Sequence, residues 1–327
     1  MNRLMSIAEV SALIRSGAAL ALAGPESALD ALPPGNWLAG TIPYFTDATG
    51  GVVSQEGRVF VTELPAQASV SLAHYPADRL EGVLDNGPDN GFSLAIVPAG
   101  GEAHRRFAEN AASDARAFLK PTVGWVAGVH LSDLGRVKPK VFLGSAGRKF
   151  EDGMVVAHVA LPESQLASIE IVNIFEPDNT DVLRFTATSF EVGECLVNGE
   201  KVSLAAYVTH RGLSDGRLPL VGDFGGARIN VSIQAVDTAA DKVTFYAPVF
   251  TGVDYHFAKP IADYASKFRQ QLADYPTDGV QFSCNCILNF LFGGLEGQHI
   301  GELHGPVTFG EIGYQLLNQT LVVLRIQ

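Results

Sequence analysis

The sequence predicts an α+β fold of two related halves, residues 1–192 and 193–327, each a mainly antiparallel or mixed sheet covered by helices. Short apolar runs rich in β-branched residues recur along the whole chain, separated by Gly, Pro or Asn. Segments with the apolar spacing of long helices are few. A Gly-containing strand–loop–strand pattern appears at 40–62 and again at 305–322, which indicates a degenerate internal repeat. Two unrelated Gly-rich units would give the same pattern.

Composition excludes several classes of function. The 327 residues are 47% hydrophobic and 18% charged, which is typical of a globular protein with a substantial core. Lys and Arg number 23 against 35 Asp and Glu, a net charge of −12, and the basic residues form no cluster. Nucleic acids and anionic membranes are therefore poor partners, because both require local positive charge.

The chain is expected to be cytoplasmic. Three cysteines argue against a disulfide scaffold and for a reducing compartment. Glu9 and Arg15 interrupt the apolar pattern of the N-terminus, so it does not predict a signal peptide. No apolar run approaches the ~20 residues that a membrane span requires.

The first third of the chain begins with a helix. Ser6 and Glu9 form a capping box, and Gly17 provides a helix stop. The pattern that follows predicts strands and helices in turn: a strand at 18–23, a short helix at 25–32, strands at 37–45, 58–64 and 92–97, and a helix at 102–120 ended by Pro121.

The pattern of the middle third predicts mainly strands. Predicted strands cover 140–143, 154–161, 168–175 and 183–192. The intervening Gly144-Ser145-Ala146-Gly147 lacks the Lys-Ser/Thr of a phosphate-binding loop, so a tight turn is expected there.

The last third opens with the strongest hairpin signal in the chain, Asn198-Gly199 between apolar runs. Later segments alternate between strand and helix patterns. They are predicted as strands at 228–236 and 243–249, a helix at 261–272, a strand at 280–284, a turn at Asn285, a helix at 286–292 and a strand at 318–324.

Several of these segments resemble the FIST domain, a bacterial sensory domain thought to bind small ligands. The C-terminal resemblance is carried by Phe282-Ser283-Cys284, Phe309-Gly310-Glu311-Ile312 and Asn318-Gln319-Thr320-Leu321, and the N-terminal one by the Gly144–Gly147 loop with Asp152-Gly153. The chain has Cys286-Ile287 where the family places Gly-Arg, so an arginine that would hold a ligand anion is missing.

The resemblance and the gathering of Gly with uncharged polar residues predict a ligand pocket between the two halves. Thr41, Tyr44 and Thr308 are expected at its mouth. Asn289 and Asn318 would hold a ligand amide or cap a helix. The remaining expected lining residues are Cys284, Asn285 and Glu311.

Glu311 is the candidate for charge recognition. It is a single carboxylate among Phe309, Gly310 and Ile312, and the chain has no Lys or Arg between Arg269 and Arg325. A ligand amine is the natural partner if the carboxylate lines a pocket wall. A surface turn is the alternative.

Cys284 and Cys286 alternate with Asn285, so both thiols point the same way in an extended strand. They are expected as small core hydrophobes. A thiol nucleophile would need His299 or His304 as its base. Cys-x-Cys alone does not have zinc-site spacing, so no metal is expected. Some FIST proteins sense gases through haem, but no residue here selects an axial ligand, and no cofactor is expected.

The sequence thus predicts a cytoplasmic, non-enzymatic sensory protein that binds a small polar metabolite, such as an amino acid, and passes the signal to a partner protein. No segment reads as a fused output domain. The alternatives are a hydrolase-like enzyme using Cys284 with a histidine, a haem-based gas sensor, and a scaffold whose pocket is vestigial.

Overall fold

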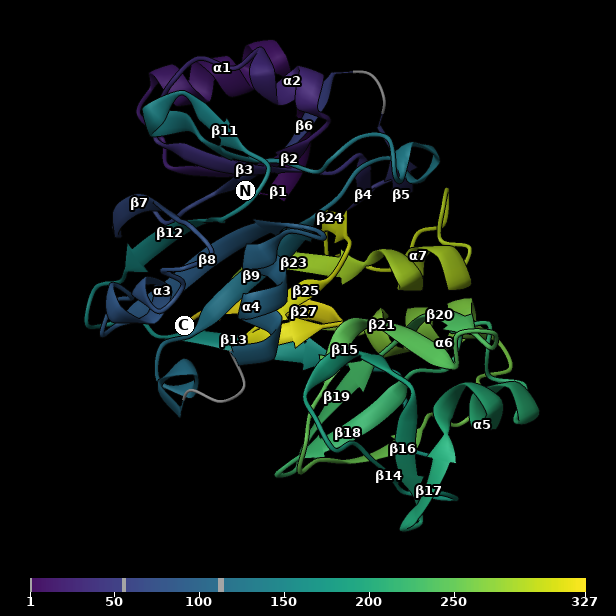
Figure 1. Cartoon of the computed structure of the whole chain (residues 1–327). Helices are drawn as coiled ribbons and strands as arrows, with labels where there is room; N and C mark the ends of the chain where they lie inside the picture. Colours follow the sequence, from purple (N-terminus) through teal and green to yellow (C-terminus); the bar gives the residue numbers. More distant parts are fainter. Residues whose placement is uncertain (1, 55–56, 111–114) are drawn as a thin grey trace.

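Strands dominate the architecture of the chain, as Figure 1 shows for a computed structural model describing residues 2–54, 57–110 and 115–327. The longest helices of these residues, α1 (Ile7–Arg15), α4 (Glu102–Asn110) and α6 (Tyr264–Leu272), have nine residues each. The sheets are antiparallel or mixed. The predicted α+β class is therefore confirmed. None of the described helices has the length and apolarity that a membrane crossing requires.

The first sheet lies beneath α1 and α2 (Glu26–Asp30) (Figure 1). The predicted capping box at its N-terminal helix is present: Ser6 Oγ accepts from the Glu9 N–H, and the Glu9 carboxylate accepts from the Ser6 N–H. Only β2 and β3 pair in parallel. The strand order is β1 (Asn2–Ser6), β6 (Arg58–Glu63), β2 (Leu20–Gly24), β3 (Trp37–Thr41), β10 (Val141–Leu143) and β11 (Arg148–Phe150).

The second sheet crosses the middle of the molecule, with α4 on one face (Figure 1). Its two central strands, β8 and β9, are parallel, and two strands from the C-terminal region extend it beyond β9. The strand order is β26 (Gln315–Leu317), β25 (Glu311–Gly313), β9 (Thr122–Ala127), β8 (Gly91–Pro98), β12 (Met154–Ala160) and β7 (Ser69–Tyr75).

The third sheet also joins distant parts of the chain. C-terminal strands pair on one side with β13 and on the other with β4. The strand order is β13 (Ala167–Val172), β27 (Leu321–Ile326), β23 (Val280–Cys286), β24 (Gly305–Thr308), β4 (Tyr44–Asp47) and β5 (Gly50–Val53). The helix α7 (Ile287–Phe292) follows β23 directly.

A second hydrophobic core forms the part drawn in green at the lower right of Figure 1. Its hairpin turn at Asn198-Gly199 has positive φ at both residues, as predicted. The elements are β14 (Leu183–Arg184), β15 (Ser189–Val192), β16 (Glu194–Val197), β17 (Glu200–Ser203), α5 (Leu204–His210), β18 (Leu220–Phe224), β19 (Ala227–Val231), β20 (Ile233–Asp237), β21 (Lys242–Val249) and β22 (Asp254–Phe257).

The predicted boundary at residue 192 falls inside this second core. The largest core contains residues from Leu4 to Leu324, because C-terminal strands pair with N-terminal ones. That the chain consists of two related halves stays a prediction. The hydrophobic cores do not separate the chain at residue 192.

Several expected boundaries differ from the structure. The helix expected at 102–120 ends at Asn110, and a 3-10 turn follows at Ala115–Phe118; residues 111–114 lie outside the described part of the chain. The expected strands at 183–192 and 228–236 are each two shorter strands. Asn285 is not a turn but lies within β23, paired with Val307 and Leu321. Among the strands that the sequence did not indicate, β9 is the most central.

Gly124 in β9 packs very closely against the backbone of β8, and a substitution there tests the packing of the second sheet. Gly124 has φ +150°, and a Cβ there would lie 1.8 Å from the Ala95 carbonyl oxygen. We expect Gly124→Ala to lower the free energy of unfolding by more than about 3 kcal/mol, since neighbouring backbone must shift. Gly100, with φ +77° and nothing within 4 Å, is the matched control, and its change to Ala should cost about 1 kcal/mol. Urea unfolding that gives equal losses would contradict the packing.

Candidate functional site

Six of the eight predicted site residues lie together in the C-terminal region, in a group that we name the C-terminal polar cluster. All six are at most 3% exposed. They come from β23, α7, β24, β25 and the turn before β27: Cys284, Asn285, Asn289, Thr308, Glu311 and Asn318. Thr41 and Tyr44 do not belong to this cluster and lie at a separate pocket described below.

Hydrogen bonds join the cluster through Thr320. Glu311 Oε2 accepts from Thr320 Oγ1 at 2.7 Å and from the Thr320 N–H at 3.3 Å. Asn289 Nδ2 donates to the Thr320 carbonyl at 3.0 Å and to Asn285 Oδ1 at 2.8 Å. Thr308 Oγ1 donates to the Asn285 carbonyl at 3.3 Å. Asn285, Asn289, Thr308 and Glu311 therefore belong to one hydrogen-bond network. Cys284 and Asn318 donate instead to the Gly124 and Leu317 carbonyls.

Glu311 is fully buried, so the surface turn considered from the sequence is wrong. Burial raises its pKa to about 8, against the lowering effect of hydrogen bonds from Thr320 and Cys286. The carboxyl group is consequently protonated at pH 7. An uncharged carboxyl needs no cationic partner, which removes the reason to expect a ligand amine at this residue.

The cluster retains unused hydrogen-bonding capacity. Among the described residues, Glu311 Oε1, Asn285 Nδ2 and Asn318 Oδ1 are buried without a partner. Buried polar atoms in native proteins are nearly always satisfied, often by an ordered water that makes about three hydrogen bonds. Because Glu311 Oε2 accepts from Thr320, the proton of the neutral carboxyl lies on Oε1, so the three unpartnered groups are two donors and one acceptor.

The two thiols are core groups. Cys284 and Cys286 are each 1% exposed, and Cys284 Sγ donates to the Gly124 carbonyl at 3.3 Å. Burial, and next the nearby Glu311, raise the pKa of both thiols well above the usual value. Within the described part of the chain, neither His299 nor His304, the bases considered from the sequence, is hydrogen-bonded to either thiol. No group of described His, Cys, Asp and Glu residues has the arrangement of a metal site.

A pocket of about 390 Å³ lies where three strands of the first and second sheets end, and we call it the strand-end pocket. The carboxyl ends of β2, β3 and β9 meet there, and the Gly128 N–H donates to the Thr41 carbonyl at 2.7 Å. Apart from Thr41, which ends β3, and Ser54, which follows β5, the lining residues come after these three strands: Pro25, Glu26, Ser27, Thr41, Ile42, Pro43, Ser54, Gly128, Val129, His130, Ser132, Asp133, Val137 and Lys138.

Thr41 and Tyr44 hold one wall of the strand-end pocket. Thr41 Oγ1 accepts from the Lys140 N–H at 2.9 Å, and its hydroxyl can still donate. The Tyr44 hydroxyl accepts from the Leu131 N–H at 3.0 Å, and the ring stacks on His130 with centroids 5.7 Å apart. Tyr44 thus supports the wall from behind, whereas Thr41 lines it.

Charges of both signs border the strand-end pocket. Burial opposes ionisation of Glu26, but hydrogen bonds from Lys140 and Lys149 outweigh it and hold its pKa below the usual value. Asp133 Oδ1 accepts from Arg136 at 2.8 Å, and Lys138 lies 3.2 Å from Glu151. A carboxylate and an ammonium group therefore border the same opening, each already in an ion pair.

The sequence analysis did not predict residues 128–138 as site residues. They follow β9, which was not recognised as a strand, so nothing marked them as the residues after a carboxyl end. The usable signal was Thr122 to Ala127, an apolar and β-branched run that ends in Gly128 and a polar loop.

Residues 5–327 match the model of a family of unknown function, DUF6976. The chain belongs to this DUF6976 family. No curated protein matches the chain. The DUF6976 match spans the strand-end pocket, the C-terminal polar cluster and the second core alike.

The protonated Glu311 predicts a pH dependence of stability. Its pKa is about 8 in the folded DUF6976 protein against 4.5 ordinarily, so unfolding releases a proton between these values and stability falls as pH rises through them. The loss should reach up to about 1.4 kcal/mol per pH unit. Glu311→Gln should abolish this loss.

Chemical denaturation from pH 6.5 to 8.5 checks this. Below pH 6.5 the buried His104 and His158, whose pKa values burial lowers to about 4, act in the opposite direction. Parallel pH profiles of wild type and Glu311→Gln in the upper window would contradict a neutral Glu311.

The buried thiols predict resistance to alkylation. Cys284, Cys286 and Cys195 are all at most 1% exposed, and burial raises the pKa of Cys195 to about 11. N-ethylmaleimide should label none of them in the native protein within an hour and all of them after denaturation, because reaction needs an accessible thiolate. Mass spectrometry gives the count. Rapid native labelling of Cys284 would instead favour the Cys/His enzyme.

Proposed function

We propose that this DUF6976 protein is a cytoplasmic sensory protein of the FIST type that binds a small polar metabolite, such as an amino acid, in the strand-end pocket. It would report binding to a signalling partner. The resemblance of 282–321 and 144–153 to the FIST domain supports the sensory class. The strand-end pocket supports ligand binding.

The observation that carries the proposal is the position and lining of the strand-end pocket. Its volume of about 390 Å³ is within the range of small-molecule sites. Ligands of sheets with parallel strands bind beyond the carboxyl ends of those strands, because loops and backbone N–H groups converge there. β2, β3 and β9 all end at this pocket.

The charges favour a zwitterion. A ligand amine at Asp133 would share that carboxylate with Arg136, and a ligand carboxylate at Lys138 would share that ammonium with Glu151, so one small molecule with both groups can pair with both residues. The Thr41 hydroxyl supplies a neutral hydrogen bond. This arrangement transfers the recognition role predicted for Glu311 to residues of another loop.

The FIST-like motif positions this pocket without lining it. Phe309 packs directly on Gly128, where an added Cβ would meet the Phe309 ring at 2.4 Å. The Phe309 N–H donates to the Val126 carbonyl, and the Val126 N–H donates to the Gly310 carbonyl. The residues around Glu311 thereby fix the end of β9 that leads into the pocket.

The remaining side chains of the strand-end pocket support ligand binding and not catalysis. His130 Nδ1 accepts from the Ser132 N–H at 3.2 Å and lies 2.7 Å from Ser132 Oγ, as a helix-capping residue does. This imidazole nitrogen is occupied by the cap. The buried thiols lack the accessible thiolate that a hydrolase would use.

Calorimetry with amino acids that raise the melting temperature tests the proposal. Asp133→Asn should weaken binding about tenfold, the equivalent of one charge-assisted hydrogen bond near the surface. Asp254→Asn is the matched control, since Asp254 also pairs with an arginine, Arg184, but lies at the start of β22 and does not line the strand-end pocket.

The control variant should bind like wild type. Equal affinity of the Asp133→Asn variant would place the ligand elsewhere. Failure of every amino acid and related zwitterion to shift the melting temperature at millimolar concentration would overturn the ligand class.

A further inference from the structure

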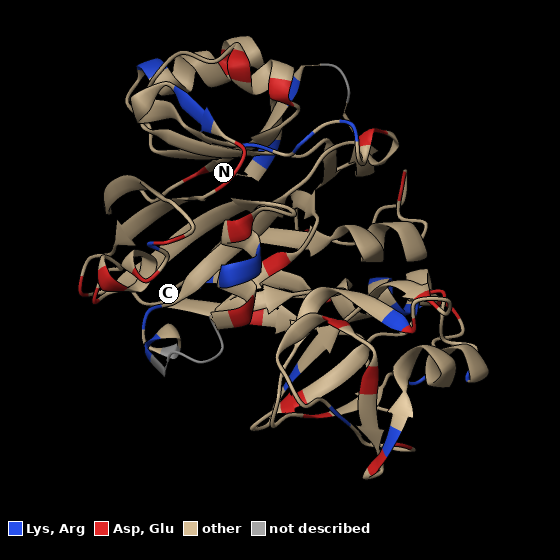
Figure 2. Cartoon of the chain, in the orientation of Figure 1, with Lys and Arg blue, Asp and Glu red and all other residues tan. Residues whose placement is uncertain are grey.

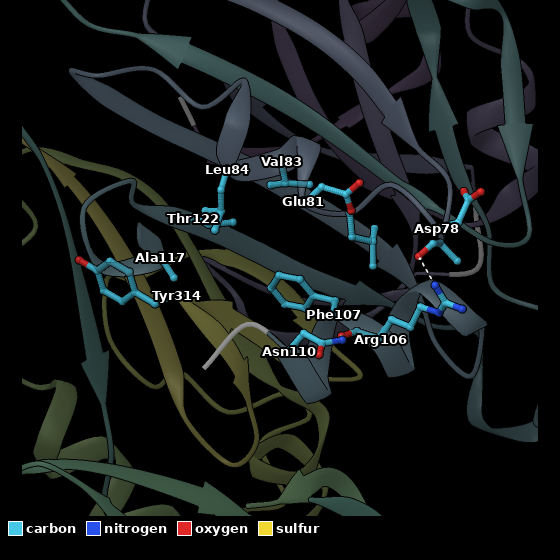
Figure 3. A pocket seen from close by; sticks show the side chains of 12 residues that line it. Asp78, Glu81, Val83, Leu84, Arg106, Phe107, Asn110, Ala117, Thr122 and Tyr314 are labelled. Atoms are coloured by element: carbon cyan, nitrogen blue, oxygen red, sulfur yellow. Dashed lines mark hydrogen bonds between the residues drawn. The ribbon is translucent and has the colours of Figure 1, made fainter. Parts of the chain in front are cut away.

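A second pocket, of about 320 Å³, lies between α4 and α3 (Gly82–Asp85) (Figure 3). We propose that this α4 pocket binds a small molecule with an aromatic or short aliphatic body and an uncharged or cationic head. The inference is independent of the proposed function, because the α4 pocket shares no lining residue with the strand-end pocket.

The interior of the α4 pocket is apolar. Phe107 occupies the middle of the view in Figure 3, with Val83 and Leu84 on the α3 side. Burial of apolar ligand surface contributes roughly 25 cal/mol per Å², so an apolar body gains most of its affinity here. The apolar lining residues are Ala77, Leu80, Val83, Leu84, Phe107 and Ala117.

Acidic groups outnumber basic ones at one end of the α4 pocket. Arg106 reaches across this end in Figure 3 and donates to the Ala77 carbonyl at 3.5 Å. Its Nε also donates to Glu102 Oε1 at 2.7 Å, a carboxylate that Arg105 shares, so Arg106 is already in an ion pair. Asp78 and Glu81 add two further carboxylates to the lining. An anionic head would meet net negative charge, whereas an amine or hydroxyl group would not.

Tyr314 builds the other end from the C-terminal region. It is held with φ +64°, an uncommon conformation for a residue with a side chain, and its N–H donates to the Thr122 carbonyl at 2.8 Å. Left-handed backbone is unfavourable at such a residue and persists where the surroundings enforce it. The turn between β25 and β26 thus brings an aromatic ring into the α4 pocket wall.

The α3 wall is anchored by a buried polar row. His158 Nε2 lies 2.7 Å from the Tyr75 hydroxyl and Nδ1 lies 2.9 Å from Ser93 Oγ. Asn86, directly after α3, donates to the same Tyr75 hydroxyl at 3.1 Å. Ser93 is the β-sheet neighbour of Thr122, which lines the pocket. Hydrogen bonds between these elements hold the wall in place before any ligand binds.

A matched series of ligands tests the proposed chemistry. Benzyl alcohol, benzylamine and benzoate share one ring and differ in the charge of the head. Titration followed by NMR or calorimetry should give comparable affinities for the alcohol and the amine. Benzoate should bind at least tenfold more weakly.

A variant pair tests the location. Ala117→Phe fills the pocket from its wall, where Ala117 is 4% exposed, and should abolish benzyl alcohol binding. Leu119→Phe is the control at a residue that is 77% exposed in the same segment, and should leave binding unchanged. Phe107→Ala provides a second test if Ala117→Phe does not fold, and it should weaken binding by at least tenfold.

Three results would overturn the inference. These are no binding of any of the three compounds at 10 mM, as an order of magnitude for weak fragments, equal binding of benzoate, or unchanged binding in a folded Ala117→Phe or Phe107→Ala variant. Each outcome is separable from the amino-acid test, because Asp133 does not line the α4 pocket.

Discussion

The structure depends on how residues 280–327 pair with the rest of the chain. β23 and β27 pair with each other, β24 pairs with β4, and β25 pairs with β9. The last 48 residues therefore supply strands to two sheets and close both against the N-terminal region. Pairing of this kind joins residues up to 261 positions apart (Pro306 with Phe45), so it requires the closure of very long loops during folding.

The short stretch from Phe309 to Tyr314 links the three sites. Phe309 packs on the loop that enters the strand-end pocket, Glu311 belongs to the C-terminal polar cluster, and Tyr314 lines the α4 pocket. Glu311 lies in β25 and must be protonated for this strand to be stable, because an ionised carboxylate fully excluded from water would destabilise it. Figure 2 shows the other Asp and Glu residues interspersed with Lys and Arg along the chain, where water or ion pairs stabilise their charge.

Local signals in the sequence were sufficient for much of the fold. The capping box at Ser6 and Glu9 and the hairpin at Asn198-Gly199 depend on a few neighbouring residues, and both are present. β9 was missed because Gly124 weakens a strand pattern, and only the close approach of Ala95 explains that glycine. Asn285 was expected in a turn, but pairing on both sides overrides its local preference.

The candidate sites show the same limit. Spacing and polarity in the sequence identified six residues that do lie together, although four of them are hydrogen-bonded within one network and not to a ligand. Sequence alone did not reveal that Glu311 is surrounded on all sides, so its ionisation was misjudged. Asp133 and His130 border a pocket only because β2, β3 and β9 end at the same place, which is a property of the assembled sheets.

The most direct test of the central claim is a crystal structure of the protein grown with the amino acid that most raises its melting temperature. The proposed function predicts electron density for that molecule in the strand-end pocket, with its amine at Asp133 and its carboxylate toward Lys138. Density for the ligand at Glu311 instead, with only water in the strand-end pocket, would contradict it.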